Sequence, residues 1–563
     1  ICGTNGAFDA DTLIQVRLDF LSSEGATLLA LSTNACADCW RTYTLSAAAP
    51  TGTVIVRPSL FIGISTSTNG IGYWDDAELL YGVTRTTLYV SVTCTNPLPP
   101  YGNWDTAATN IQDAVDVAPD GATVIVGDGT YAAGTRTSGE YDVTYHHQYT
   151  WPYSWVEYLY DEQLNRIVLD HPVTVRSLNG PHHTILDGST NARCAFLKSG
   201  TSLIGFTLKN GRSYTGYAQF AGGGGAMLRA DRRLANCIVV SNRAAAVSYS
   251  GGGGVSSDPG SRVEHCYFEG NDAYSGGALY SKGSFVENCI MVRNSGTYGP
   301  TVLASTSTFR NCLMAEGTGF YGGGAALNPG CVLENCTIVS NHAVAGGGVL
   351  LWGQTNSTVL RNCVIYHNTH NSSYESSEGS NWTSFIGSQS VFFHCCTGPL
   401  PPGEGNINTN PLLRADTYQP LYGSPCIDTG MILTDVTNDL LGIARPMGSG
   451  YDIGAYEYDS ATADSDDDGM MDDQEIRAGC APDNPSSCLR LLEPEPADAN
   501  GHQMVLRWLG SVGKRYRLLR STNLHANFQE IARDIDGTGP GTSFVDNSAP
   551  TDSTCFYRVV LQE

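Results

Sequence analysis

The chain has 563 residues, more than a single hydrophobic core usually organises, so several domains are expected. Its 31 basic and 55 acidic residues give a net charge of −24, which repels phosphates and argues against nucleic acid as a partner. With 64 glycines and 15% charged residues, the composition favours a turn-rich all-β protein over a helical bundle.

Neither a membrane span nor a leader segment is evident in the sequence. No window approaches the roughly 20 apolar residues that cross a bilayer. We therefore expect a mature secreted protein, extracellular or on the cell surface, whose targeting segment has been removed. The 18 cysteines suit such an oxidising compartment only if they pair, so their positions matter more than their number. Two pairs have spacings that allow local disulfides, Cys36 with Cys39 and Cys480 with Cys488.

Residues 1–86 alternate apolar and polar side chains, as strands with one buried face do. The stretches 49–57 and 72–79 resemble carbohydrate-binding modules of the jelly-roll type, in which the final strand carries a double aspartate like Asp75-Asp76. A segment this short implies a partial jelly roll with unpaired edges, which a strand of a neighbouring molecule would complete. A small sandwich that closes on itself is the alternative.

Residues 87–458 are expected to form one domain that begins with a short amphipathic helix at 103–116. An insertion, 141–160, is dense in aromatic side chains, which stack on sugar faces or anchor protein contacts. Its candidate contact residues for a polysaccharide or a partner are Trp151, Tyr153, Trp155 and Tyr158. A loop that folds over the domain and buries its own rings fits the same pattern. A later loop, 369–390, carries glycosylation sequons at Asn371 and Asn381.

A repeat in the middle of the chain determines the predicted fold. A cysteine preceded by asparagine or histidine recurs every 23 to 32 residues: Cys237, Cys266, Cys289, Cys312, Cys336, Cys363 and Cys395. An asparagine, or once Gly317, follows five positions later: Asn242, Asn271, Asn294, Asn341 and Asn368. Because these residue types tolerate the left-handed backbone, we expect each coil to bend there. The period and its β-branched runs predict a parallel β-helix solenoid, whereas the leucine lattice of leucine-rich repeats is missing.

Stacked coils place equivalent residues above one another at about the 4.8 Å spacing of neighbouring strands. The cysteines are therefore expected to form a buried interior ladder and the asparagines a hydrogen-bonded one. Parallel side-chain directions disfavour disulfides along such a ladder, so we expect these thiols to be reduced.

This region resembles the right-handed parallel β-helices of the pectate-lyase-like superfamily. The residues 424–457, here called the closing segment, contain SPCIDTG, GIARP and DIGAYE. They resemble the end of bacterial surface β-helix proteins of the choice-of-anchor type, in which attachment or adhesive modules follow. The resemblance implies a right-handed β-helix flanked by β-sandwich modules.

Enzymes with this fold use clustered carboxylates, often with calcium and a basic residue. The repeats instead place small and amide side chains where acids would be needed, and their charged residues share one repeat position: Glu264, Glu287, Arg310, Glu334 and Arg361. We interpret that position as a solvated face. Five other charged residues are interpreted as isolated surface groups: Asp187, Lys209, Lys282, Arg293 and His342.

Residues 459–488 contain the sharpest chemical motif of the chain. Carboxylates stand at positions 1, 3, 5, 9 and 12 of a loop with Gly469 at position 6, and Met470 at position 7 offers a backbone carbonyl. The expected Ca²⁺ ligands are Asp464, Asp466, Asp468, Met470, Asp472 and Glu475. The segment resembles a thrombospondin type-3 or EF-hand-like loop, which as a single copy implies a rigidifying linker. An acidic linker without metal is the alternative.

Residues 489–563 alternate as strands do, notably at 505–508, 516–519 and 556–560, and resemble a fibronectin-III-like sandwich with Trp508 in its core. Together these features favour a non-catalytic extracellular structural or adhesive protein that self-associates into surface fibres through head-to-tail contacts of its sandwich modules. Two alternatives stay open. One is a polysaccharide lyase or glycoside hydrolase, and the other is a monomeric carbohydrate-binding surface protein.

Overall fold

A computed structural model of the chain describes residues 2–5, 13–21, 27–34, 55–63, 71–74, 87–138, 141–147, 154–160, 163–198, 200–214, 222–245, 251–353, 358–371, 380–384, 390–487, 489–497, 503–525, 527–550 and 554–562. Side chains are described from residue 87 onward, except in 141–147 and 154–160. The chain divides into two compact units, Ile1–Thr86 and Thr87–Glu563. Among the described residues, no helix has the length and hydropathy needed to cross a membrane.

The first unit consists of antiparallel strands. Its strands are β1 (Cys2–Asn5), β2 (Leu13–Leu21), β3 (Thr27–Asn34), β4 (Ile55–Gly63) and β5 (Ile71–Trp74). β2 is central in a three-stranded sheet with β3 and β4, and β1 pairs with β5. Cys36 and Cys39 lie outside the described residues.

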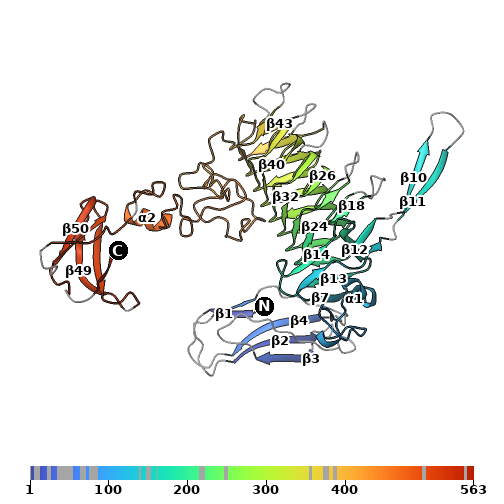
Figure 1. The fold of residues 1–563 in the computed structure, drawn as a ribbon, viewed down its shortest axis with the longest axis horizontal. Coiled ribbons are helices and arrows are strands. Elements are labelled where there is room, and N and C mark those ends of the chain that lie inside the picture. The colour runs from blue at the N-terminus through green and yellow to red at the C-terminus, as the bar shows by residue number, and fades with distance from the viewer. Residues whose placement is uncertain are drawn as a thin grey trace. The chain divides into compact units, whose positions relative to one another are not determined.

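The second unit is dominated by a parallel β-helix in which each full coil contributes one strand to each of four sheets (Figure 1). Sheet 1 contains β9 (Arg136–Thr137), β12 (Leu164–Leu169), β15 (Arg193–Leu197), β19 (Ala226–Leu228), β23 (Val255–Ser257), β27 (Leu279–Lys282), β31 (Val302–Ser305), β35 (Ala325–Leu327), β39 (Val349–Leu351) and β43 (Trp382–Ser384). Sheet 2 contains β6 (Thr87–Val90), β7 (Ala122–Val126), β13 (Val173–Ser177), β16 (Ser202–Ile204), β20 (Arg233–Ala235), β24 (Arg262–Glu264), β28 (Phe285–Glu287), β32 (Thr308–Arg310), β36 (Val332–Glu334), β40 (Val359–Arg361) and β44 (Val391–Phe393).

Two further sheets complete the coils. Sheet 3 contains β8 (Gly129–Tyr131), β14 (Thr184–Asp187), β17 (Thr207–Lys209), β21 (Ile238–Val240), β25 (Tyr267–Glu269), β29 (Ile290–Val292), β33 (Leu313–Ala315), β37 (Thr337–Val339), β41 (Val364–Tyr366) and β45 (Cys396–Thr397). Sheet 4 contains β18 (Arg212–Ser213), β22 (Arg243–Ala244), β26 (Asp272–Ser275), β30 (Ser295–Tyr298), β34 (Thr318–Tyr321), β38 (His342–Ala345) and β42 (Thr369–His370). The chain is thus an all-β protein built around a solenoid, as the repeat predicts.

The cysteine ladder lies at the corner between sheets 2 and 3. Its seven cysteines point into the interior with exposed fractions of at most 2%: Cys237, Cys266, Cys289, Cys312, Cys336, Cys363 and Cys395. All seven are free thiols. The residue before each cysteine has the left-handed backbone, as at Asn236 with φ 52° and His265 with φ 51°. This left-handed residue turns the chain outward at the corner and leaves the cysteine facing the core.

The asparagine ladder lies at the corner between sheets 3 and 4. Where the next coil also has an asparagine, the buried amide donates to it, as Asn242 does to Asn271 and Asn271 does to Asn294, both at 3.0 Å. The expectation that these asparagines carry the left-handed bend is wrong. The preceding residue carries it instead, for example Ser241 with φ 55° and Arg293 with φ 54°, because an interior amide must keep both its donor and its acceptor aligned with the stack.

The start of the β-helix is covered by two short helices, η1 (Trp104–Thr106) and α1 (Ile111–Val117). The expected helix at 103–116 is therefore interrupted, because the Asn110 side chain caps a new helix by accepting from the Gln112 amide at 3.0 Å. Ile111, Ala114 and Val115 are buried in the solenoid core, on the face that the sequence indicates. A hairpin of β10 (Tyr141–His147) and β11 (Ser154–Tyr160) follows.

The closing segment packs against the outer side of sheet 3. Val339 and Val364 of that sheet share a buried apolar cluster with Cys426, Ile453 and Tyr456. Backbone bonds fix the contact, since the Gly454 amide donates to the Asn362 carbonyl at 2.8 Å. The last coils therefore have apolar residues on both faces of sheet 3.

The C-terminal part begins with α2 (Asp472–Ala478). Its strands are β46 (Glu495–Pro496), β47 (Met504–Leu509), β48 (Arg515–Ser521), β49 (Gln529–Asp536), β50 (Pro540–Asp546) and β51 (Phe556–Leu561). They form two three-stranded antiparallel sheets, ordered β46-β47-β50 and β49-β48-β51. Trp508 and Tyr516 meet between the sheets with no exposed surface, which confirms the prediction that Trp508 is a core residue.

Candidate functional site

The acidic loop of 464–475 brings three carboxylates together. The nearest carboxylate oxygens of Asp464, Asp466 and Asp468 all lie within 4.8 Å of one another. Backbone amides hold this curl, because Gly469 N donates to Asp464 at 3.0 Å and Met470 N donates to Asp468 at 2.8 Å. Gly469, with φ 93°, supplies the left-handed turn on which the loop closes.

Five carboxylate oxygens of this loop are buried and accept no hydrogen bond from the described residues. They are Oδ1 of Asp464, Oδ2 of Asp466, Oδ2 of Asp468 and both Oε atoms of Glu475. Glu475 has no exposed surface. Desolvation and the neighbouring Asp466 and Asp468 charges raise the pKa of Glu475 to about 7. Desolvation, followed by Asp468, also raises the pKa of Asp466. Buried anionic oxygens without donors are costly unless a cation compensates them.

Asp472 has a different role from the one its loop position predicts. Its carboxylate accepts from the Ser465 amide at 2.7 Å, from the Ser465 hydroxyl at 2.6 Å and from the Tyr458 hydroxyl at 2.6 Å. These bonds tie the two ends of the loop together and to the residue that follows the closing segment. In this geometry Asp472 positions the loop, and four other acids supply the unpartnered oxygens.

The loop is also anchored to the region that precedes the closing segment. The Arg414 guanidinium donates to the Asp464 carbonyl and pairs with the Asp467 carboxylate. The Tyr422 amide donates to the Ser465 hydroxyl at 2.9 Å. The loop therefore joins the end of the β-helix domain to α2.

The donor set fits a hard divalent cation. Carboxylate oxygens at positions 1, 3, 5 and 12, together with a glycine at 6, are the ligand chemistry that Ca²⁺ uses in single-loop sites. Asp464, Asp466, Asp468 and Glu475 would hold the ion, and it would neutralise their mutual repulsion. Met470 stands at the position whose carbonyl completes such a set.

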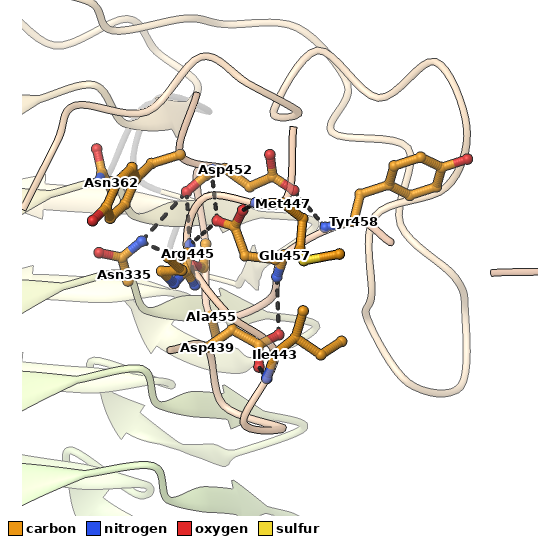
Figure 2. Close-up of polar contacts among 12 residues, drawn as sticks. Asn335, Asn362, Asp439, Ile443, Arg445, Met447, Asp452, Ala455, Glu457 and Tyr458 are labelled. Carbon is orange, nitrogen blue, oxygen red and sulfur yellow. Dashed lines mark hydrogen bonds and ion pairs between the residues drawn. The ribbon is translucent and has the colours of Figure 1, made fainter. Parts of the chain in front are cut away.

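Figure 2 shows a second buried polar cluster, within the closing segment. Arg445 Nη1 lies 2.5 Å from Glu457 Oε1, and its Nη2 donates to the Gly454 carbonyl at 2.8 Å. Glu457 also accepts from the amides of Asp452 at 2.9 Å and Met447 at 3.0 Å. These contacts fold the segment into a compact turn that presents Ile453 and Ala455 to sheet 3.

Asp452 lies beside this ion pair. Its two carboxylate oxygens accept from the backbone amides of Asp428 at 2.7 Å and Tyr458 at 2.6 Å. Desolvation, followed by the Glu457 charge, raises the pKa of Asp452 to about 7 despite these two donors. The cluster is thus an internal structural lock, and among the side-chain polar atoms of Arg445, Asp452 and Glu457 only Arg445 Nε is buried without a hydrogen-bond partner.

The repeated charged position of sheet 2 is not a solvated face, which corrects the sequence interpretation. Glu264, Glu287, Arg310, Glu334 and Arg361 stack in register at the ends of β24, β28, β32, β36 and β40. Glu264 is 8% exposed and Glu334 is 6% exposed. Glu334 pairs with Arg310 and Arg361, both at 2.9 Å. Arginines of adjacent coils thus neutralise Glu334, and Arg233 and Arg262 neutralise Glu264, so these two acids tolerate burial.

Four of the five residues interpreted as isolated surface groups have partners. Asp187 lies 3.6 Å from Lys209, and Arg293 pairs with Glu269 at 2.8 Å. His342 Nδ1 lies 2.8 Å from the Thr369 hydroxyl. Sequence spacing alone misses these pairs because each joins residues of neighbouring coils.

A groove of about 900 Å³ runs along the outer side of sheet 3, beside Leu440 of the closing segment. Ile238, Tyr267 and Leu440 line its apolar part, and His265 and Glu269 are among its polar residues. The groove continues the same sheet face that the closing segment covers further along. Sequence analysis did not find it, because its residues come from several coils.

Several predicted site residues lie outside the described residues or on a strand whose side chains are not described. Trp151 and Tyr153 lie outside the described residues, and Trp155 and Tyr158 lie on β11, whose side chains are not described. Cys480 is half-buried, and Cys488 lies outside the described residues.

The asparagine ladder extends to one of the two sequons. Asn381 Oδ1 accepts from the Asn368 amide nitrogen at 3.1 Å, and its Nδ2 donates to the Gly398 carbonyl at 3.0 Å. In the folded chain, Asn381 Nδ2, the atom to which a glycan would be attached, is therefore engaged in a hydrogen bond. Asn371, the other sequon, is exposed.

The comparison with family models agrees with this architecture. Residues 198–369 match the family model described as the right-handed β-helix region. The crystal structure of pectate lyase Pel9A aligns with 67% of this chain and 98% of that chain, at 13% sequence identity and a TM-score of 0.37. No curated protein matches the sequence. The matched coils are therefore a parallel β-helix, as the cysteine repeat predicts, and it is right-handed, as the family resemblance implies.

Proposed function

We propose that this chain is a secreted, non-catalytic structural or adhesive protein whose β-helix is joined to its C-terminal sandwich through a Ca²⁺-stabilised linker. The observation that carries the proposal is the set of five unpartnered carboxylate oxygens in 464–475. They belong to the loop that follows the closing segment and to Glu475 of α2, so a bound cation would rigidify the connection between them. Extracellular modules of this chemistry bind Ca²⁺ with dissociation constants of roughly 10⁻⁴ to 10⁻³ M, which suits a secreted protein.

The charges of the β-helix support a structural role. Glu264 pairs with Arg233 at 2.9 Å and Glu334 with Arg310, so these buried acids serve as ion-pair partners between coils. A glycosidase or lyase would need acids free to exchange protons with a substrate. Self-association into fibres through the sandwich modules is part of the same proposal. Electron microscopy of the concentrated protein should show filaments. Strictly single particles would refute self-association.

Calcium titration tests the linker directly. We expect isothermal titration of the full chain with CaCl₂ to show one binding event and thermal unfolding to shift upward with added Ca²⁺. Glu475→Gln should weaken binding by at least tenfold, because both of its oxygens are buried without a partner and its carboxyl feels the Asp466 and Asp468 charges. Asp473→Asn is the matched control. Asp473 is in the same helix turn but pairs with Arg477 at 2.8 Å, so its loss should leave affinity within about twofold. No binding at millimolar Ca²⁺ would refute the linker proposal.

Carbohydrate binding is the second candidate function, and the groove on sheet 3 favours it. Tyr267 offers an aromatic ring, and His265 and Asn288 offer polar groups beside it, a combination that suits a sugar chain. A glycan array with the wild type, Tyr267→Ala and the control Tyr274→Ala tests it. Tyr274 lies on sheet 4, where it contacts Tyr298. Release of unsaturated uronates or reducing ends from the same glycans would instead establish the enzymatic alternative.

A further inference from the structure

One side of the C-terminal sandwich is open. Among the described residues, β51 pairs with β48 alone, so it is an edge strand. Tyr557, Val559 and Leu561 pack against the buried core of the sandwich, yet part of each side chain stays exposed. A hollow of about 410 Å³ beside the first residues of β51 is lined by Leu491 and Leu524, the second of which is 58% exposed. A further strand beside β51 would cover these apolar groups.

The hydrogen bonds of β51 show which of its backbone groups face this open side. Gln562 N donates to the Arg515 carbonyl of β48 at 2.8 Å, so the backbone of Gln562 faces β48. Because successive residues of an antiparallel strand direct their amides and carbonyls to opposite sides, three residues of β51 direct them away from β48: Tyr557, Val559 and Leu561. A row of amides and carbonyls at a sheet edge recognises one kind of partner, an extended polypeptide strand.

The other edge strands of the sandwich are protected from such pairing, and β51 is not. β46 has two residues, one of which is Pro496, and β50 begins at Pro540. β49 carries four charged residues: Glu530, Arg533, Asp534 and Asp536. Short strands, prolines and charges are the usual means of preventing contact between sheet edges. By contrast, β51 contains no proline and a single charged residue, Arg558.

The sequence of β51 is complementary to itself in antiparallel pairing. When two copies of the strand pair about Val559, this residue lies opposite its own copy and Tyr557 lies opposite Leu561. Arg558 then lies opposite Val560, so no charge faces a like charge. A pairing centred on Arg558 would instead place two guanidinium groups opposite each other, which is destabilising. The self-complementary register indicates that the partner strand is a second β51.

We propose that β51 pairs antiparallel with β51 of a second copy of this chain, so that the two sheets of β49, β48 and β51 join into one continuous sheet. The inference rests on the self-association in the proposed function and names its contact surface. Backbone hydrogen bonds would provide the affinity, and Leu561 of one copy would cover Tyr557 of the other. The contact is two-fold symmetric, so by itself it gives a dimer, and a fibre needs a second contact elsewhere.

Sedimentation velocity of the full chain over a range of concentrations tests the contact. We expect the dimer fraction of the wild type to rise with concentration. Val559→Pro should weaken dimerisation at least tenfold, because it removes an amide at the centre of the contact. That amide faces away from β48, so the sandwich keeps its own hydrogen bonds. Thermal unfolding checks that the variant is folded.

Variants of Val560 test the register independently of the proline. This residue lies opposite Arg558 of the other copy, and each dimer contains two such pairs. Val560→Glu should therefore tighten dimerisation by about fivefold and Val560→Lys should weaken it by about as much. Val545→Lys is the matched control, because Val545 lies on β50 of the other sheet and is 40% exposed. It should leave the dimerisation constant within about twofold.

The outcomes separate this contact from the proposed function. A wild type that stays monomeric at every concentration would overturn both the β51 contact and the self-association of the proposed function. Self-association that Val559→Pro and both Val560 variants leave unchanged would overturn the β51 contact alone. If Val559→Pro fails to fold, the opposite effects expected of the two Val560 variants decide the question.

Discussion

Arg445 and Glu457 form an ion pair that is closed off from solvent, with side-chain exposures of 0% and 1% and a separation of 2.5 Å. The pair shapes the turn that presents Ile453 and Ala455 to sheet 3. Two charges without water depend on each other, because either one alone would be an uncompensated buried ion. Loss of either charge of the Arg445–Glu457 pair should therefore detach the closing segment from sheet 3.

Replacement of Glu457 by Gln should destabilise the β-helix domain by about 3–5 kcal/mol, the usual cost of breaking a buried pair. Glu495→Gln is the matched control, since Glu495 and Arg507 form a pair with side chains 62% and 44% exposed. An exposed pair contributes about 1 kcal/mol or less. Thermal unfolding followed by calorimetry compares the two variants. Equal shifts would show that burial of the Arg445 pair is irrelevant.

The stability of the closing segment should also depend on pH through Asp452. Burial, followed by the Glu457 charge, raises the pKa of Asp452 from 3.8 to about 7. The folded chain therefore binds its proton more tightly than the unfolded chain, and stability falls as the pH rises from about 4 to about 7. Hydrogen exchange of residues 428–458 between pH 4.5 and 7.5, corrected for the intrinsic rate, measures this. Asp452→Asn should flatten the profile, and an unchanged profile would assign the dependence to another group.

The sequence predicted the solenoid because its repeat directly reflects stacking. Cys237 and Asn242 recur at fixed offsets, and equivalent residues of a coil must lie above one another. The position of the left-handed bend was predicted wrongly. Asparagine tolerates that backbone, but Ser241 takes it, and burial of the Asn242 amide dominates. Local preference therefore gave way to a tertiary hydrogen bond.

Contacts between segments far apart in the chain could not be predicted in the same way. Arg310 and Asp435 pair although the sequence separates them widely. No periodicity encodes such contacts. The acidic loop was more predictable, because Asp464, Asp466 and Asp468 lie close together along the chain. The hydrogen bond from the Tyr458 hydroxyl to the Asp472 carboxylate depends on the fold, so the loop sequence does not predict it.

The asparagine ladder makes a testable contribution to stability. Asn271 accepts from Asn242 N at 3.1 Å and Asn242 Nδ2 at 3.0 Å, and its own Nδ2 donates to the Val239 carbonyl at 2.8 Å. Asn271→Ala leaves these buried groups unpaired, which should cost about 1–3 kcal/mol or more. Asn179→Ala is the control, because Asn179 is an exposed asparagine bonded to exposed Asp128. Comparable losses in urea unfolding of the two variants would contradict a structural ladder.

The glycine runs between sheets 4 and 1 have a steric origin that one substitution can test. A Cβ atom at Gly323 would lie 2.1 Å from the Gly347 carbonyl oxygen of the next coil, far inside van der Waals contact. Since that oxygen belongs to the backbone, the two coils must separate, and Gly323→Ala should destabilise the β-helix by several kcal/mol. At Gly102, a Cβ atom would meet nothing within 4 Å, so Gly102→Ala should change stability by less than about 1 kcal/mol. Both changes add the same methyl group. The difference in melting temperature between the two variants therefore measures the cost of the steric clash at Gly323. A Gly323→Ala variant as stable as the wild type would mean that the coils are more loosely stacked at this corner than the Gly347 contact requires.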